Sequence, residues 1–254
     1  MNYLRFGTGK RTLVILPGLS VQGVVGSAGQ IAEAYGFMAD EFTVYLFDRR
    51  LDPPPVYTVR DMAEDTVQAI RAVGINDLCL FGASQGGMIA LQIAIDHPDL
   101  VRKIAVGSSS SDLKGKTSAL LEEWIRFAKA KDRRGLYLSF GKSLYPPDVF
   151  ERYKSALLAA AETVTEEDLK RFLVYTEGMK DFCVVDQVKK IQCPALVIGV
   201  YEDAVLDSDM TMEIAEQLDR KEGFELYMYK GYGHAAYDTA PDYRERLYRF
   251  FLKP

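Results

Sequence analysis

Cysteines, histidines and long apolar runs are all scarce in this sequence of 254 residues. The three cysteines, Cys79, Cys183 and Cys193, form neither a disulfide framework nor a zinc-ligand spacing. Reduced thiols and a cytoplasmic location are therefore expected. No stretch approaches the roughly 20 apolar residues that a membrane helix needs, and residues 1–10 lack the apolar segment of a signal peptide.

An excess of charge of one sign is also absent. The chain has 31 basic and 36 acidic residues, a formal net charge of −5. Because the two signs are interleaved, no basic face for nucleic acid is expected. The expected partner is a small-molecule substrate, with no membrane, metal or cofactor, and the sequence carries no signal for an oligomeric state.

Short apolar runs alternate with helical patterns over much of the chain. Six runs are typical of strands, at residues 13–16, 44–47, 78–81, 104–106, 195–198 and 226–229. Most are continuous, as in strands that helices cover on both faces. Thr58 with Asp61 resembles the capping box of a helix that Gly74 would end, and Pro98 would end a second helix over 88–97. This alternation predicts a mostly parallel sheet.

The alternation stops between residues 112 and 190, where the pattern is almost entirely helical. Within 118–131, four apolar residues are expected on one helix face, namely Leu120, Leu121, Trp124 and Phe127. Pro147 is placed to begin a helix that runs to Ala161, and Thr165 with Asp168 resembles a second capping box. We predict a helical cap of residues 112–190, inserted into an α/β core of residues 1–111 and 191–254.

The most specific motif is Gly-Ala-Ser-Gln-Gly at residues 82–86, which fits G-x-S-x-G between an expected strand and an expected helix. In such a turn the serine is exposed on a strained backbone, and the flanking glycines allow neighbouring chain to pass closely. The following helix N-terminus favours developing negative charge. Ser84 is therefore the predicted nucleophile. The alternative is a glycine-rich turn whose serine only caps the helix.

The search for a base is short, because the chain has two histidines. His97 lies 13 residues beyond Ser84 near the end of the same helix, which places it roughly 20 Å away at 1.5 Å per residue. His234 follows the last expected strand in a glycine-flanked loop and is the predicted base.

The third member of a triad should orient His234, and the chain order Ser, acid, His favours Asp203 after the strand at 195–198. Three other acids remain alternatives: Glu202, Asp207 and Asp112. An oxyanion hole needs two converging N–H donors. The turn after the first core strand predicts Leu19 as one donor, and the residue after the nucleophile, Gln85, as the other.

Several segments resemble the α/β-hydrolase fold superfamily, in its cap-bearing branch of small esterases, C–C bond hydrolases and related enzymes. They are LPGLS at 16–20, FDRR at 47–50, GASQGG at 82–87, DHPDLV at 96–101, GVYEDAV at 199–205 and GYGHAAYDTAPDY at 231–243. The resemblance implies an eight-stranded, mostly parallel sheet flanked by helices, a helical cap after the sixth strand, and a Ser-Asp-His triad. The chain departs from many relatives at Pro17, where they have histidine, and at 51–55, where a proline run replaces a glycine.

The implied function is hydrolysis of an ester or thioester of a small, largely apolar substrate through an acyl-enzyme. With the same triad the protein could instead cleave a C–C bond in a diketone-like substrate or transfer the acyl group. From a different class, a hydrolase-fold ligand receptor with little turnover, or a pseudoenzyme, is a further alternative. Three cap aromatics are predicted to line the pocket, Trp124, Phe127 and Tyr145. Arg49 and Arg50 would either bind a substrate carboxylate or form structural ion pairs.

Overall fold

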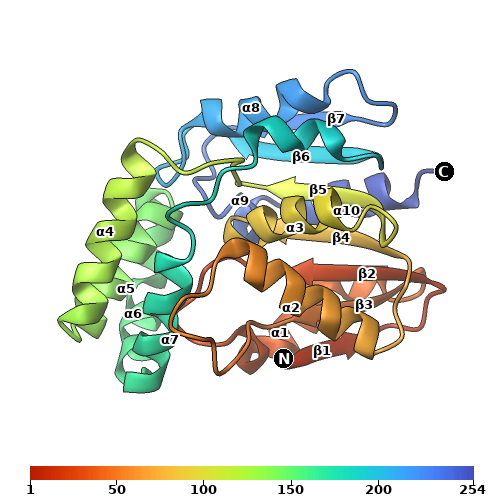
Figure 1. Cartoon of the computed structure of the whole chain (residues 1–254). Helices are drawn as coiled ribbons and strands as arrows, with labels where there is room; N and C mark the ends of the chain where they lie inside the picture. Colours follow the sequence, from red (N-terminus) through yellow and green to blue (C-terminus); the bar gives the residue numbers. More distant parts are fainter.

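The computed structural model describes residues 1–254, which fold around one sheet of seven strands in the order β1-β3-β2-β4-β5-β6-β7 (Figure 1). The strands are β1 Tyr3–Phe6, β2 Arg11–Leu16, β3 Phe42–Phe47, β4 Leu78–Ala83, β5 Val101–Gly107, β6 Ala195–Val200 and β7 Glu225–Tyr229. β1 pairs antiparallel with β3, and all other neighbours are parallel. Each of the six predicted runs lies within one of these strands, which confirms the α/β fold class.

The family resemblance implied eight strands with a cap after the sixth, and both numbers are wrong. The sheet has seven strands, and the inserted helices follow the fifth, β5.

The six predicted apolar runs, in turn, leave out one strand. This strand is β1, which pairs antiparallel at the edge of the sheet, and its four residues alternate between exposed and half-buried. Such a short edge strand has no continuous apolar run, which is why the sequence patterns did not reveal it.

Helices cover both faces of the sheet (Figure 1). On one face lie α2 Val59–Ala72, α3 Gln85–Asp96 and α8 Ser208–Leu218, and on the other α1 Ala28–Tyr35 and α10 Tyr243–Leu252. Alternate strand residues pack toward each side: Val14, Leu80 and Val197 join one buried cluster, and Leu13, Phe81 and Ile198 the other. The shorter helices are η1 Val24–Ser27, η2 Gly36–Met38, η3 Val185–Lys190 and α9 Ala236–Thr239.

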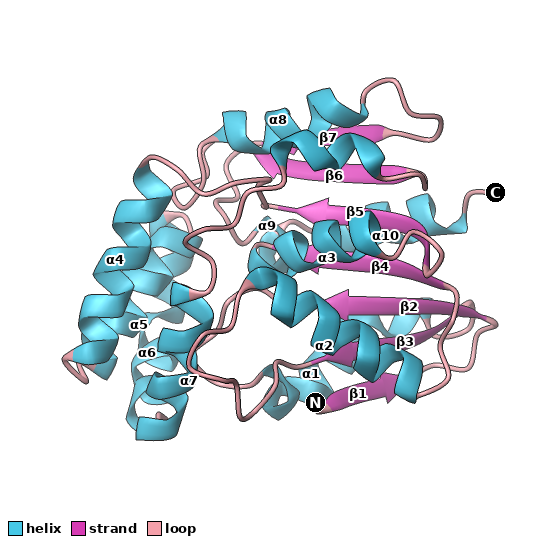
Figure 2. Cartoon of the chain, in the orientation of Figure 1, coloured by secondary structure: helices cyan, strands magenta, loops and turns pink.

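Between β5 and η3 the chain forms four helices, α4 Lys116–Lys129, α5 Arg133–Leu144, α6 Pro147–Thr163 and α7 Glu166–Glu177, which we call the cap helices. They lie beyond the carboxyl ends of the parallel strands, toward which the arrowheads point (Figure 2). Both predicted capping boxes are present, at the starts of α2 and α7. None of the helices combines the length and apolar character that a membrane crossing requires.

Candidate active site

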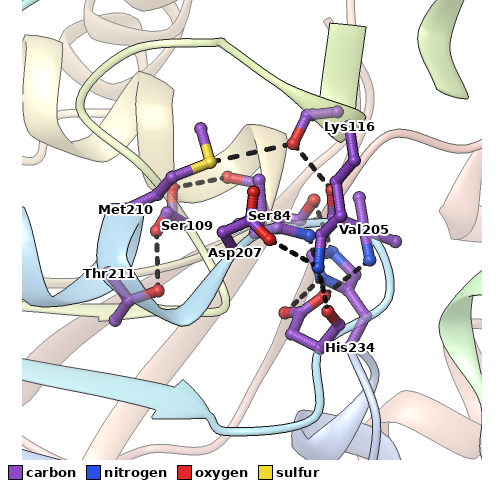
Figure 3. Close-up of polar contacts among 11 residues, drawn as sticks. Ser84, Ser109, Lys116, Val205, Asp207, Met210, Thr211 and His234 are labelled. Carbon is purple, nitrogen blue, oxygen red and sulfur yellow. Dashed lines mark hydrogen bonds and ion pairs between the residues drawn. The ribbon is translucent and has the colours of Figure 1, made fainter. Parts of the chain in front are cut away.

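Ser84 lies at the sharp turn between β4 and α3, with φ 52° and ψ −121°. Its N–H donates to the Gly107 carbonyl at 2.8 Å, and the Ser109 hydroxyl donates to its carbonyl at 2.9 Å (Figure 3). A positive φ in a residue with a side chain costs about 1–3 kcal/mol, so contacts on both sides of the peptide must stabilise it. β5 thus supports the backbone that presents the hydroxyl.

The flanking glycines are required because backbone segments pass very close to them. A Cβ on Gly82 would lie 2.1 Å from the Gly86 carbonyl oxygen, and one on Gly86 would lie 2.1 Å from the Leu16 carbonyl oxygen. Both distances are far below van der Waals contact, so only glycine fits. The turn therefore packs α3 directly against the end of β2.

The structure brings Ser84, His234 and Asp203 into one hydrogen-bonded chain. The His234 Nε2 atom lies 2.9 Å from Ser84 Oγ, and Nδ1 lies 2.8 Å from Asp203 Oδ2 and 3.0 Å from Oδ1. His234 is 1% exposed and Asp203 5%. The three side chains that were predicted as nucleophile, base and orienting acid are therefore within hydrogen-bond reach of one another.

Asp203 is held as a carboxylate. Burial would raise the pKa of Asp203, but His234 and the N–H groups of Val205 and Leu206 lower it below its ordinary value. Those two N–H groups donate to Oδ1 at 2.8 and 2.9 Å. An ionised acid in this place can fix the imidazole tautomer and stabilise the imidazolium.

The other candidate acids and the second histidine have different partners. Glu202 accepts from Gly231 N–H at 2.9 Å, Asp207 pairs with Lys116 at 2.9 Å, and Asp112 pairs with Lys114 at 3.3 Å. His97 lies at the end of α3, 2.9 Å from the carboxylate of Glu64. None of them is hydrogen-bonded to His234 or Ser84.

The two proposed oxyanion donors flank Ser84. The Leu19 N–H has no hydrogen-bond partner within the protein, and Leu19 lines the same cavity as Ser84. Gln85 is the first residue of α3, so its N–H is one of the helix's unpaired donors. Both predicted donors therefore have an N–H group without a partner in the protein, and Leu19 shares its cavity with Ser84.

A small, mostly apolar cavity lies in front of Ser84. Its lining residues are Gly18, Leu19, Ser84, Met88, Thr117, Leu121, Trp124, Phe140, Leu144, Met179, Val205, Leu206, His234 and Tyr237. The space open to the centre of a water molecule is about 20 Å³, which is room for one water or little more. Core and cap helices thus close over the serine.

The sequence matches the model of the Alpha/beta hydrolase family over residues 13–245, which is most of the chain. The chain belongs to this family. It is therefore a hydrolase enzyme with the α/β-hydrolase fold.

Individual relatives of this α/β hydrolase are distant in sequence. It is 25% identical over 233 residues to a protein of Enterobacter cloacae with the provisional name carbamate hydrolase RutD, covering 87% of this chain and 85% of that protein. It is 26% identical over 169 residues to the (E)-2-((N-methylformamido)methylene)succinate hydrolase of Acinetobacter baylyi, and the match covers 63% of this chain and 60% of that protein.

Two solved structures share the fold. The deep-sea metagenome α/β hydrolase MGS-M2 has a TM-score of 0.87 at 20% identity, covering 100% of this chain and 94% of that one. The enol-lactonase from Burkholderia xenovorans LB400 has a TM-score of 0.83 at 17% identity, and the match covers 99% of this chain and 96% of that one. At these identities the likeness extends to the fold alone.

Of the cap aromatics predicted to line the pocket of this α/β hydrolase, Trp124 lines the cavity at Ser84. Phe127 lies in an outer groove between α4 and α5, and Tyr145 in another groove beside Pro146. On α4 the cavity-facing stripe is Thr117, Leu121 and Trp124, whereas Phe127 belongs to the neighbouring stripe. Sequence reasoning missed Thr117, although its spacing from Leu121 and Trp124 was visible.

The first turn of α4 is joined to the loop that carries the acid (Figure 3). Lys116 Nζ donates to the Asp203 carbonyl at 2.7 Å and pairs with Asp207. The next residue, Thr117, donates its hydroxyl to the Val205 carbonyl at 2.7 Å. The position of this cap helix is therefore coupled to the position of Asp203.

The two adjacent arginines have different environments. Arg50 is half-exposed and pairs with Asp52 and Asp65, each at 3.2 Å. Arg49 is 8% exposed and is hydrogen-bonded to Pro17 and Gln85. Neither side chain lines the cavity at Ser84.

Proposed function

We propose that this α/β hydrolase is a serine hydrolase that cleaves an ester or thioester of a small, largely apolar substrate through an acyl-enzyme on Ser84. The observation that carries the proposal is the 2.9 Å contact between Ser84 Oγ and His234 Nε2 at the wall of an apolar cavity. The bond from His234 Nδ1 to Asp203 supports the same assignment.

In this mechanism His234 takes the proton of Ser84 as Oγ attacks the carbonyl carbon. The resulting tetrahedral oxyanion accepts hydrogen bonds from the N–H groups of Leu19 and Gln85, and Asp203 stabilises the imidazolium. The intermediate collapses when His234 gives its proton to the leaving alcohol or thiol. A water activated by His234 then releases the acid and restores Ser84.

The cavity supports the substrate class. Apart from Ser84, Thr117, His234 and Tyr237, its lining side chains are apolar or absent, which suits a short acyl group. Because about 20 Å³ is too small for an ester, we propose that the cap helices form a mobile lid that moves before substrate enters. Closure over the acyl-enzyme would exclude bulk water.

The first test is covalent labelling. A fluorophosphonate should modify Ser84, and Ser84→Ala should lose both labelling and turnover, by about 10⁴-fold or more because triad members act as a unit. Ser118→Ala, an exposed serine on α4, is the matched control and should behave like wild type. Labelling that survives in Ser84→Ala would refute the assignment.

A substrate panel on the purified protein then separates the alternatives. It contains p-nitrophenyl esters of varied chain length, thioesters, diketones and, because of the name that the Enterobacter relative carries, carbamates. Turnover of esters or thioesters is the expected result. Cleavage restricted to diketones would replace the proposal with C–C hydrolysis, and labelling without turnover of any substrate would favour a ligand receptor.

A further inference from the structure

A buried guanidinium lies behind the Ser84 turn without a carboxylate partner. Arg49 follows β3 and is 8% exposed, and the main charge acting on it is the buried carboxylate of the adjacent Asp48, with which it forms no ion pair within 4 Å. Its Nη2 donates to the Pro17 carbonyl at 2.6 Å and its Nε to Gln85 Oε1 at 3.2 Å. A buried charge is costly unless it is well hydrogen-bonded, so these two oxygens largely determine where this side chain can lie.

The two oxygens belong to the two segments that carry the proposed oxyanion donors. The Pro17 carbonyl lies in the turn that leads to the Leu19 N–H, and Gln85 supplies the second N–H itself. The same Pro17 oxygen lies 2.5 Å from the position of a Cβ on Gly86, so the start of α3 packs directly against this carbonyl. One planar group therefore bridges the turn and the helix start where they meet.

The bridge continues to the cap helices. Gln85 Nε2 donates to the carbonyl of Tyr175 in α7 at 3.1 Å. Gln85 is 0% exposed, and its amide has a partner on each side. Arg49 is thus the first member of a buried chain that runs from the β2 turn through the helix start to α7.

We propose that Arg49 is a positioning residue for the oxyanion hole, which holds the Leu19 turn against the start of α3 so that both N–H groups converge on one oxygen. The inference rests on the proposed function, since it assumes an oxyanion at this place. Burial lowers the pKa of Arg49 to about 10, so the group remains a cation at neutral pH.

Arginine suits this role better than lysine because its rigid fork can donate to two acceptors at a fixed separation. Arg49→Lys keeps the charge but cannot reproduce that geometry, and Arg49→Met removes both. Removing one oxyanion donor outright costs about 10²–10³ in kcat. A variant that only displaces the two N–H donors should lose less kcat than one that removes a donor. We therefore expect kcat to fall about 10–100-fold in Arg49→Met and less in Arg49→Lys, with KM nearly unchanged.

The chain provides a matched control in the next residue. Arg50→Met removes a neighbouring arginine whose partners are the exposed Asp52 and the partly buried Asp65, and its kcat should stay near that of wild type. Transition-state selectivity gives the second readout. The affinity of Arg49→Met for a trifluoromethyl ketone, which forms a tetrahedral adduct, should weaken as much as kcat/KM does. The affinity for the product alcohol should not change.

If Arg49→Met does not fold, Gln85→Leu removes the other end of the bridge while keeping the backbone N–H. Its loss of kcat should be strongly non-additive with that of Arg49→Lys, because the two residues form one contact. Independent, additive losses would overturn the inference.

The outcomes keep the two proposals apart. A wild-type protein that is not labelled at Ser84 and hydrolyses nothing defeats the proposed function. A labelled, active wild type whose Arg49 variants lose thermal stability, but keep kcat and ketone affinity per folded molecule, overturns the role of Arg49 alone.

Discussion

At the residue scale, the acid of the proposed triad makes more contacts than its role requires. Asp203 receives two backbone N–H bonds in addition to the imidazole. Its loop is therefore folded around the carboxylate, and the histidine meets an acceptor that is already in place.

Replacing Asp203 with asparagine should leave the fold largely intact and lower kcat by orders of magnitude, about 10⁴-fold in the best-studied case of this substitution. The amide presents an N–H or a weaker acceptor to His234 Nδ1 and so favours the wrong tautomer. Steady-state kinetics on a p-nitrophenyl ester measure the change. Glu202→Gln and Asp112→Asn serve as controls and should be mild, and a severe loss in Asp112→Asn would transfer the role to the loop after β5.

The residues of the proposed triad could be chosen from the sequence because few residues compete for each place. Two histidines, one G-x-S-x-G motif and a fixed chain order left little choice for Ser84 and His234. The environment of Arg49 could not be predicted, since nothing local distinguishes it from Arg50. Only the packing of β3 beside β2 places one arginine under the turn and the other at the surface.

At the element scale, the missed helix is instructive. Sequence patterns did not reveal α5, which contains Gly135 and Gly141, and a glycine within a helix costs about 1 kcal/mol relative to alanine. Packing explains why α5 has a glycine at each of these two positions. A Cβ on Gly135 would lie 2.7 Å from the Phe127 side chain, and one on Gly141 would lie 2.5 Å from the Leu157 side chain. These close contacts between helices favour small residues at the two positions, and a local sequence pattern does not contain them.

The link between α4 and the acid loop yields a second element-scale expectation. Lys116→Met keeps the aliphatic stem but loses the bond to the Asp203 carbonyl, so the loop should loosen. The lost hydrogen bond of this half-exposed lysine is worth about 0.5–1.5 kcal/mol. If loosening the loop raises the activation free energy by the same amount, kcat falls about 2–12-fold. Lys114→Met, which instead loses contacts to Asp112 and Glu213, should be nearly neutral, and equal losses in both variants would contradict a specific link.

At the scale of the whole molecule, core and cap helices make the cavity together. Gly18, Met88 and Val205 come from the core, and Leu121 and Trp124 from α4. The side chains of Met88, Val205, Leu121 and Trp124 also belong to one buried cluster that extends from α2 and α3 into the cap helices. The division into core and cap at residues 112 and 190 stays a prediction, and this shared cluster indicates that the two parts stabilise each other.

Trp124→Ala should enlarge the cavity and shift preference toward longer acyl chains. The indole packs against Phe140 with ring centroids 4.4 Å apart and the ring planes tilted by 46°, and it donates a hydrogen bond to Ser139, so some loss of stability will accompany the change. The measurement is kcat/KM across an ester series in both proteins, with Phe127→Ala, outside the cavity, as control. Parallel profiles for Trp124→Ala and wild type would mean that the tryptophan only supports the fold.

The 150 residues that separate Ser84 from His234 also have a consequence for biosynthesis. At a translation rate of 5–20 residues per second, roughly 8–30 s pass between the addition of the serine and that of the histidine. Through this interval the nascent chain holds its proposed nucleophile without the base that would activate it. On the proposed mechanism, covalent chemistry can begin only after β7 has been made and has joined the edge of the sheet, and we therefore expect partly synthesised chains to be inert.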